Sequence, residues 1–258
     1  MTRASKSIAL ALAAILSWPW RLLPAGLRRR ALFGLALIES RIGAPGDALG
    51  RLFGVADDLE LLINERAMAL GGGEHPKHRL TGYHDFFVER IPAGARVLDV
   101  GCGYGAVARS IARRVENVEV TGIDLNAERI REAEAADNPA NLRFIGGDAL
   151  CDLPAGAWDV VVLSNVFEHI EQRVGFLRRL VEHAAPGRIL MRVPLFERHW
   201  QMPMRRELGA NYFSDPTHFI EHTLDEFTAE IAAAGLEITE RQTLWGEIWA
   251  VCRPSATR

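Results

Sequence analysis

Residues 96–108, with the sequence RVLDVGCGYGAVA, decide the fold of this chain. A short apolar run containing the acid Asp99 leads into Gly101, Gly103 and Gly105, and an amphipathic stretch follows. The apolar run predicts a buried strand, and the glycines allow a turn with positive φ that approaches a ligand closely. The next helix would present free N–H groups at its N-terminus. The stretch therefore predicts a strand–turn–helix unit with a ligand at the turn.

The spacing of the glycines distinguishes this turn from a dinucleotide-binding turn. A dinucleotide fingerprint follows the pattern G-x-G-x-x-G, which leaves room for a pyrophosphate. Here the pattern is G-x-G-x-G, and Asp99 stands two residues before the first glycine. A carboxylate at the end of the strand suits a ligand with an ammonium group better than a phosphate. We therefore expect Asp99 to orient an amine.

Three later apolar runs also end in polar residues. Asp124 is placed to accept hydrogen bonds from ribose hydroxyls, and Asp148 from an adenine amino group. Asn165 follows the fourth run. Because parallel strands bring their carboxyl ends to one edge of a sheet, we expect these side chains around the glycine turn.

The alternation of apolar runs and amphipathic stretches is typical of an α/β fold. The expected strands are 96–100, 119–124, 142–145, 158–164, 188–193, 236–243 and 248–253. Helices are expected at 106–114, 127–135 and 172–184, and a capping box from Thr223 to Glu226 opens another that runs to about Ala234. Trp245 and Gly246 are expected at the tip of a hairpin. The sequence predicts a Rossmann-like, seven-stranded, mostly parallel sheet with helices on both faces.

The motifs LDVGCGYG, GIDL, GDA and SNVFEHI resemble those of class I S-adenosylmethionine-dependent methyltransferases, over roughly residues 92–252. The resemblance implies a sheet whose last strand is antiparallel, and S-adenosyl-L-methionine as the cofactor. It also implies cofactor contacts from Asp99, Gly101, Cys102, Gly103, Tyr104, Gly105, Asp124, Leu125, Asp148, Ala149, Asn165 and Val166.

Two segments can supply the groups that handle the methyl acceptor. A hydroxyl acceptor must be positioned and must lose a proton. Glu168 and His169 follow the fourth strand, although packing or cofactor contact is the alternative role for His169. The connection 195–222 is long enough to form a lid over the site.

Within this connection, we expect His218 to act as general base, oriented by Asp215 or Glu221. The alternative is the start of a surface helix with incidental histidines. His218 and His222, one helical turn apart, could also chelate a metal with Asp215, but the prediction is that no metal is bound.

The acceptor is expected to be a small molecule or a glycan. The connection is rich in polar and aromatic side chains, and residues 215–218, DPTH, resemble methyltransferases associated with bacterial glycan and lipid-linked saccharide assembly. A lipid or quinone acceptor is the alternative, and a non-catalytic cofactor-binding or scaffolding protein is the alternative of another class. Residues 75–79 with Tyr83 and His84 are expected to close over the acceptor or the cofactor carboxylate.

Residues 1–73 are predicted to be a helical segment that precedes a methyltransferase domain at 74–258, with Gly71–Gly73 as a hinge. The apolar stretch 7–16 follows basic residues, and extending it to Leu27 would include Pro19, Arg21 and Pro24. The segment 27–43 again has an apolar stretch behind three arginines. Both apolar stretches suit helices that lie on an anionic membrane surface, at the inner face of the cytoplasmic membrane. The alternative is a helical cap on the catalytic domain.

Charge and cysteine content limit the remaining classes. The chain of 258 residues has a net charge of −3, which argues against a surface built for nucleic acid. Its first 50 residues are nevertheless basic, with seven Lys or Arg against two acids. Three widely spaced cysteines fit a reducing cytoplasm. The sequence does not indicate which oligomeric state the protein has.

Overall fold

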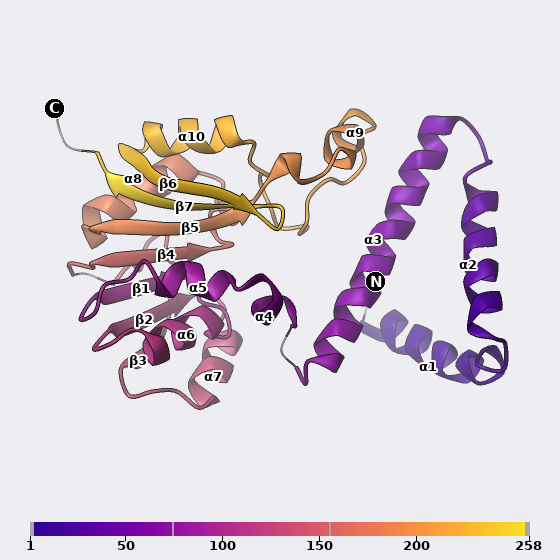
Figure 1. Cartoon of the computed structure of the whole chain (residues 1–258), viewed down its shortest axis with the longest axis horizontal. Coiled ribbons are helices and arrows are strands. Elements are labelled where there is room, and N and C mark those ends of the chain that lie inside the picture. The colour runs from indigo at the N-terminus through magenta and orange to yellow at the C-terminus, as the bar shows by residue number, and fades with distance from the viewer. Residues whose placement is uncertain (1–2, 74, 155, 256–258) are drawn as a thin grey trace. The chain divides into compact units, whose positions relative to one another are not determined.

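The computed structural model describes residues 3–73, 75–154 and 156–255 (Figure 1). The chain forms two compact units. The first ends at Asn64 and takes in Leu208–Ala210, and the second comprises Glu65–Glu207 and the chain from Asn211 onward. The change from one unit to the other falls inside helix α3 (Pro45–Leu70), before the glycines at 71–73.

The second unit is built on a seven-stranded sheet with the order β3-β2-β1-β4-β5-β7-β6 (Figure 1). The strands are β1 (Arg96–Val100), β2 (Glu119–Asp124), β3 (Leu142–Gly146), β4 (Val160–Ser164), β5 (Arg188–Pro194), β6 (Leu236–Leu244) and β7 (Glu247–Pro254). Strands β1 to β5 pair in parallel, and β7 runs antiparallel to both β5 and β6. The predicted fold class is therefore confirmed, including the antiparallel last strand.

Helices cover both faces of this sheet. They are α5 (Tyr83–Val88), α6 (Ala106–Arg114) and α7 (Ala127–Ala135) on one face, and α8 (Arg173–Ala184) and α10 (Leu224–Ala233) on the other. Successive residues of a strand point to opposite faces. Val160 and Val162 of β4 accordingly join one core, whereas Val161 and Leu163 join the other. Burial on both faces explains why the strands are almost wholly apolar.

The local signals for two elements of the second unit are also confirmed. The Thr223 side chain caps α10 and the Glu226 side chain caps it reciprocally, as the capping box predicts. Trp245 and Gly246 both have positive φ, 56° and 76°, which matches a two-residue type I′ hairpin turn between β6 and β7. The expected strand 158–164 begins later, at Val160, so Trp158 lies outside β4. The buried Trp158 indole donates a hydrogen bond to the Pro154 carbonyl.

Several short helices were not expected from the sequence. They are α4 (Lys77–Thr81), α9 (Gln201–Glu207) and the 3₁₀ turns η1 (Phe167–His169) and η2 (Phe196–Arg198). Each is shorter than two helical turns, so none carries a clear apolar period. These elements matter here because η1 and the connection that contains η2 and α9 follow the carboxyl ends of β4 and β5.

The first unit contains α1 (Arg3–Trp20), α2 (Ala25–Glu39) and most of α3. Of the described side chains, none is buried in α2, and only Ala48 and Phe53 are buried in α3. Large apolar side chains are exposed along the described part of α1 and along α2: Leu12, Ile15, Leu16, Trp18, Leu32, Phe33, Leu35 and Ile38. Among the helices described, none has both the length and the apolar character to cross a bilayer.

Candidate active site

The glycine turn after β1 is packed too tightly for a side chain at Gly101 and at Gly105. Gly101, Gly103 and Gly105 have φ of 66°, 55° and 76°. A Cβ at Gly101 would lie 2.5 Å from Val166 Cγ2, and one at Gly105 would lie 2.4 Å from Phe144 Cζ. The turn therefore contacts both the chain after β4 and the side chain from β3, and α6 starts directly after it.

Asp124 holds this turn against the end of β2. Its Oδ2 accepts a hydrogen bond from the Gly103 N–H at 2.8 Å, and its Oδ1 accepts one from the Asn126 N–H at 2.8 Å. Each carboxylate oxygen has a second lone pair, so the side chain keeps the capacity to accept from ribose hydroxyls. The strand-end carboxylate thus fixes the turn and still presents acceptor sites at the edge of the sheet.

Asp99 is a buried carboxyl group that lacks a full set of partners. It is 1 % exposed, and its Oδ2 has no hydrogen-bond partner within the described chain. Burial raises the pKa of Asp99 to about 7, and the negative charge of Asp124 adds to this shift. Since a buried charge without a partner is costly, the site favours a ligand that brings a cationic donor. An ammonium group has the required chemistry.

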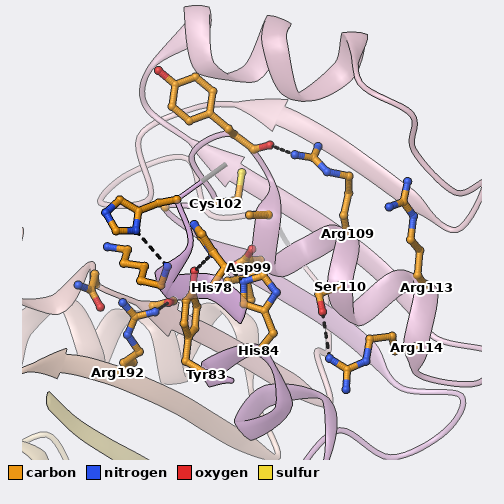
Figure 2. Close-up of a pocket in the computed structure, with 18 of the residues that line it drawn as sticks. His78, Tyr83, His84, Asp99, Cys102, Arg109, Ser110, Arg113, Arg114 and Arg192 are labelled. Carbon is orange, nitrogen blue, oxygen red and sulfur yellow. Dashed lines mark hydrogen bonds between the residues drawn. The ribbon is translucent and has the colours of Figure 1, made fainter. Parts of the chain in front are cut away.

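A cavity of about 960 Å³ lies beside Asp99 (Figure 2). Gly101, Cys102 and Asn165 line it from the ends of β1 and β4. Asn165 has a positive φ of 56°, and its buried Oδ1 has no hydrogen-bond partner in the part of the chain that the structure describes. The cavity therefore presents two unsatisfied oxygen atoms, one from each strand end.

The opposite wall of the cavity comes from α4, α5 and β5. Tyr83 Oη lies 2.6 Å from His78 Nδ1, and that nitrogen lies 3.2 Å from His84 Nε2. The Arg192 guanidinium lies over the Tyr83 ring at 3.8 Å (Figure 2). Burial lowers the pKa of His84 to about 4, so this histidine is neutral near pH 7. The expected cluster around residues 75–84 therefore does line the cavity.

Sequence reasoning missed Arg192 as a site residue. It is buried at the end of β5 and forms an ion pair with Glu247 at 2.7 Å. An arginine within the apolar strand RILMRVP was the available signal, because a buried charge in a strand requires a partner.

The remaining predicted cofactor residues stand at the neighbouring strand ends. Asp148 and Ala149 follow β3 and are half-buried, and Asp148 Oδ1 accepts a hydrogen bond from the Leu150 N–H at 2.9 Å. Leu125 and Tyr104 are exposed. Asp124 and Gly146 are register partners on β2 and β3, so these residues share the edge that carries Asp124.

The structure brings together the four residues predicted to handle the acceptor. Ligand atoms of Glu168, His169 and His218 lie within 4.8 Å of one another. We call these three residues the Glu168 cluster. Asp215 Oδ1 accepts a hydrogen bond from the Thr217 hydroxyl at 2.6 Å, and Thr217 Oγ1 lies 2.9 Å from His169 Nδ1.

His218 is oriented by Glu221 rather than by Asp215. His218 Nδ1 lies 3.0 Å from Glu221 Oε1, whereas Asp215 contacts Thr217. The Phe219 N–H donates to the Glu168 carbonyl at 2.9 Å, which pins this part of the connection to η1. Burial raises the pKa of Glu168 to about 8.

The expectation that His218 and His222 lie one helical turn apart is wrong. Residues 215–222 form turns and extended chain, because an Asp215 side-chain turn ends at Thr217 and the helix begins only after the Thr223 cap. His222 is fully buried, stacks on Phe167 and lies 3.0 Å from Glu230 Oε2 through its Nε2. It does not share a ligand set with His218.

The polar side chains of the connection largely satisfy one another. Arg198 forms an ion pair with Glu221 and donates to the Tyr212 carbonyl at 2.9 Å. Arg205 donates to the Asn211 carbonyl at 2.8 Å. These contacts hold the connection in place and engage the charged groups of Arg198, Glu221 and Arg205 within it.

Comparisons with known proteins agree with this geometry. Residues 73–241, more than half of the chain, match the family described as a methyltransferase domain. A ubiquinone biosynthesis O-methyltransferase of Psychrobacter cryohalolentis is 37% identical over 101 residues, which cover 37% of this chain and 38% of that protein. A 2-methyl-6-phytyl-1,4-hydroquinone methyltransferase of Synechocystis is 29% identical over 161 residues, which cover 58% of this chain and 48% of that protein. The chain thus spans less than half the length of either relative.

Solved structures share the fold at low sequence identity. A TehB-like SAM-dependent methyltransferase of Corynebacterium glutamicum has a TM-score of 0.52 and 19% identity, covering 78% of this chain and 99% of that one. Magnesium protoporphyrin IX methyltransferase of Synechocystis, solved with bound SAH, has a TM-score of 0.53 and 17% identity, covering 68% and 83%. The chain belongs to the methyltransferase-domain family.

Proposed function

We propose that this methyltransferase transfers the methyl group to a hydroxyl oxygen of a quinone-type or lipid acceptor. The observation that carries the proposal is the position of the Glu168 cluster. Glu168 and His169 follow Asn165 within four residues, so polar groups that can receive a proton begin where the cofactor cavity ends. An oxygen acceptor needs such groups, because a neutral hydroxyl is a weak nucleophile.

The residues of the site fit S-adenosylmethionine. The unpartnered Asp99 Oδ2 suits the ammonium group, Asp124 suits the ribose hydroxyls, and Asp148 suits the adenine amino group. When bound, the cofactor supplies a methyl group on a positively charged sulfur atom. As the new oxygen–carbon bond forms, the carbon–sulfur bond breaks with its electron pair on sulfur. The acceptor proton passes to the Glu168 cluster or to solvent.

Two observations favour a quinone or lipid acceptor over the glycan expected from the sequence. The relatives described above carry names that refer to ubiquinone and hydroquinone methylation. In addition, two charged groups of the connection 195–222, Arg198 and Glu221, are engaged with each other. A glycan site would need such groups free to bind sugar hydroxyls.

An acceptor screen with methyl-labelled cofactor tests this proposal. We expect label to enter a short-chain hydroquinone or catechol, to form an alkali-stable ether, and to be absent from oligosaccharides at the same concentration. Labelling of the oligosaccharides alone would contradict the quinone-type acceptor, and labelling of an amine in place of a hydroxyl would contradict oxygen transfer. The His183→Gln variant, changed at an exposed position of α8, should give the same acceptor pattern as the unchanged protein.

We further propose that α1 and α2 bind an anionic membrane surface. Exposed Leu and Trp side chains on these helices accompany Arg28, Arg29 and Arg30. Each arginine near an anionic surface contributes about 1 kcal/mol, so replacing all three with glutamine should weaken vesicle binding by roughly 100-fold. Co-sedimentation of the full chain with phosphatidylglycerol vesicles measures this effect.

A second triple variant controls for net charge in the vesicle experiment. Arg131, Arg179 and Arg253, all in the second unit, are changed to glutamine together. This variant should sediment like the unchanged protein. Equal loss of binding in both triple variants would indicate attraction by net charge and would contradict a role for α2.

A further inference from the structure

We propose that the Glu168 cluster is a binding site for a divalent metal ion of the zinc type. The ligand atoms of Glu168, His169 and His218 lie within 4.8 Å of one another, and Glu168 Oε1 is 4.0 Å from His218 Nε2. Bonds of about 2.0–2.2 Å place the ligands of one zinc ion roughly 3–4 Å apart. Small side-chain rotations therefore bring all three groups onto one ion.

The two histidine rings are held by partners on their other nitrogen atoms. His218 Nδ1 lies 3.0 Å from Glu221 Oε1, and His169 Nδ1 lies 2.9 Å from Thr217 Oγ1. Histidines that bind metals usually make such a contact with the nitrogen that faces away from the ion. In both residues, Nε2 remains as the ligand atom. The contacts of Glu221 and Thr217 thus orient the rings for a ligand that the protein itself does not supply.

The carboxylate of Glu168 gives independent support for a bound cation. Its side chain is 0 % exposed, and neither Oε1 nor Oε2 has a hydrogen-bond partner among the described residues. Burying an unpaired carboxylate is costly, and buried charges in proteins are paired or coordinate metals. The charge of Arg192 acts on Glu168, but Arg192 forms its ion pair with Glu247, and Arg198 forms one with Glu221.

The ligand set indicates both the metal and its use. Two histidines and one glutamate form a typical zinc site with a fourth position open. Glu168 and His169 belong to η1, directly after the strand end that lines the cofactor cavity. If the proposed oxygen transfer is correct, an acceptor hydroxyl at the open position would have its pKa lowered by the ion. In this arrangement the three side chains act as ligands and the acceptor proton passes to solvent. His218 is then a ligand instead of the general base expected from the sequence, which predicted no metal.

Metal binding can be measured without any acceptor. We would treat the full-length protein with a chelator, titrate it with Co²⁺ alone, and follow the visible absorption bands of the bound ion. The expected result is one site per chain, with displacement of Co²⁺ by Zn²⁺. Glu168→Gln and His218→Gln should each weaken Co²⁺ binding by at least about tenfold, and His183→Gln should bind as the unchanged protein does.

Cofactor binding by the same variants separates a lost metal site from a lost fold. Glu168→Gln and His218→Gln should still bind S-adenosylhomocysteine in calorimetry. The absence of saturable Co²⁺ binding, or equal Co²⁺ affinity in both variants and the unchanged protein, would overturn the metal site. Such a result would leave the acceptor screen unaffected, because that screen reports oxygen transfer directly.

Discussion

Replacing Asp99 with asparagine should weaken S-adenosylmethionine binding and, at pH 8, raise the thermal stability of the ligand-free protein. The unpartnered Oδ2 is the acceptor for the ammonium group in our assignment, and a hydrogen bond to a charged group contributes about 1.5–3 kcal/mol. Affinity should therefore fall roughly 10- to 150-fold. Stability should rise because the variant no longer carries a buried charge. Calorimetry and thermal melts measure the two effects.

The pH dependence of both quantities follows from the raised pKa. The Asp99 carboxyl keeps its proton up to about pH 7 in the folded protein, whereas its ordinary pKa is 3.8. As far as this group is concerned, the stability of the ligand-free protein should thus be highest below about pH 4. It should fall as the pH rises to about 7 and then level off. Cofactor affinity should change in the opposite direction, falling roughly tenfold per unit below pH 7.

The Asp99→Asn variant should show a weaker pH dependence of both its stability and its cofactor affinity. The groups near Asp99 that can titrate or carry charge remain in the variant: Asp124, Cys102, Tyr83, His78, His84 and Arg192. Asp58→Asn, at an exposed position of α3, should leave affinity and both profiles unchanged. An unchanged affinity in Asp99→Asn at pH 8 would exclude Asp99 as the amine-binding group.

Gly105→Ala should lower the stability of the ligand-free protein much more than Gly103→Ala. Both glycines have positive φ, so alanine costs roughly 1–2 kcal/mol at either position. At Gly105 the new methyl group would also lie 2.4 Å from Phe144 Cζ. The ring has little room to move, because Phe144 is buried and packs over Gly122, where an added Cβ would lie 2.8 Å from Phe144 Cδ1. Nothing lies within 4 Å of the corresponding position at Gly103.

The expected difference between the two variants is therefore the cost of overpacking, about 1–3 kcal/mol, on top of the shared backbone cost. Gly105→Ala should lose about 2–5 kcal/mol in total, which corresponds to a decrease in Tm of roughly 5–15 °C for a protein of this size. Thermal unfolding of the ligand-free proteins measures this. Equal decreases in Tm for the two variants would show that the Phe144 ring does not constrain the turn.

The sequence was sufficient for the elements whose signals are local. β1, β2, α6 and α7 have the predicted bounds, because alternating burial on a sheet and one apolar helix face are written in consecutive residues. The capping box at Thr223 and the turn at Trp245–Gly246 depend on the same short range. The long helix α3 was not predicted in detail, since few of its residues pack into a core that would impose an apolar period.

The candidate site depends partly on contacts between distant segments, which the sequence could not predict. The strand order places Asp99, Asp124 and Asn165 near one turn, and a parallel sheet alone is enough to predict that edge. The sequence left open whether Asp215 or Glu221 orients His218, and only the path of the chain after Pro216 decided for Glu221. Residues 48 or more positions apart, such as His169 and Thr217, meet through that path.

The amino-acid sequence by itself determined the sheet, the glycine turn and the strand-end positions of Asp99, Asp124 and Asp148, because each depends on spacing within its own strand–turn unit. Tertiary structure decided which side chains share the acceptor side. It brought His218 to Glu168, turned His222 into the core against Phe167, and placed Arg192 over Tyr83. Contacts between distant segments depend on how loops pack against a finished sheet, and no local pattern of residues specifies that packing.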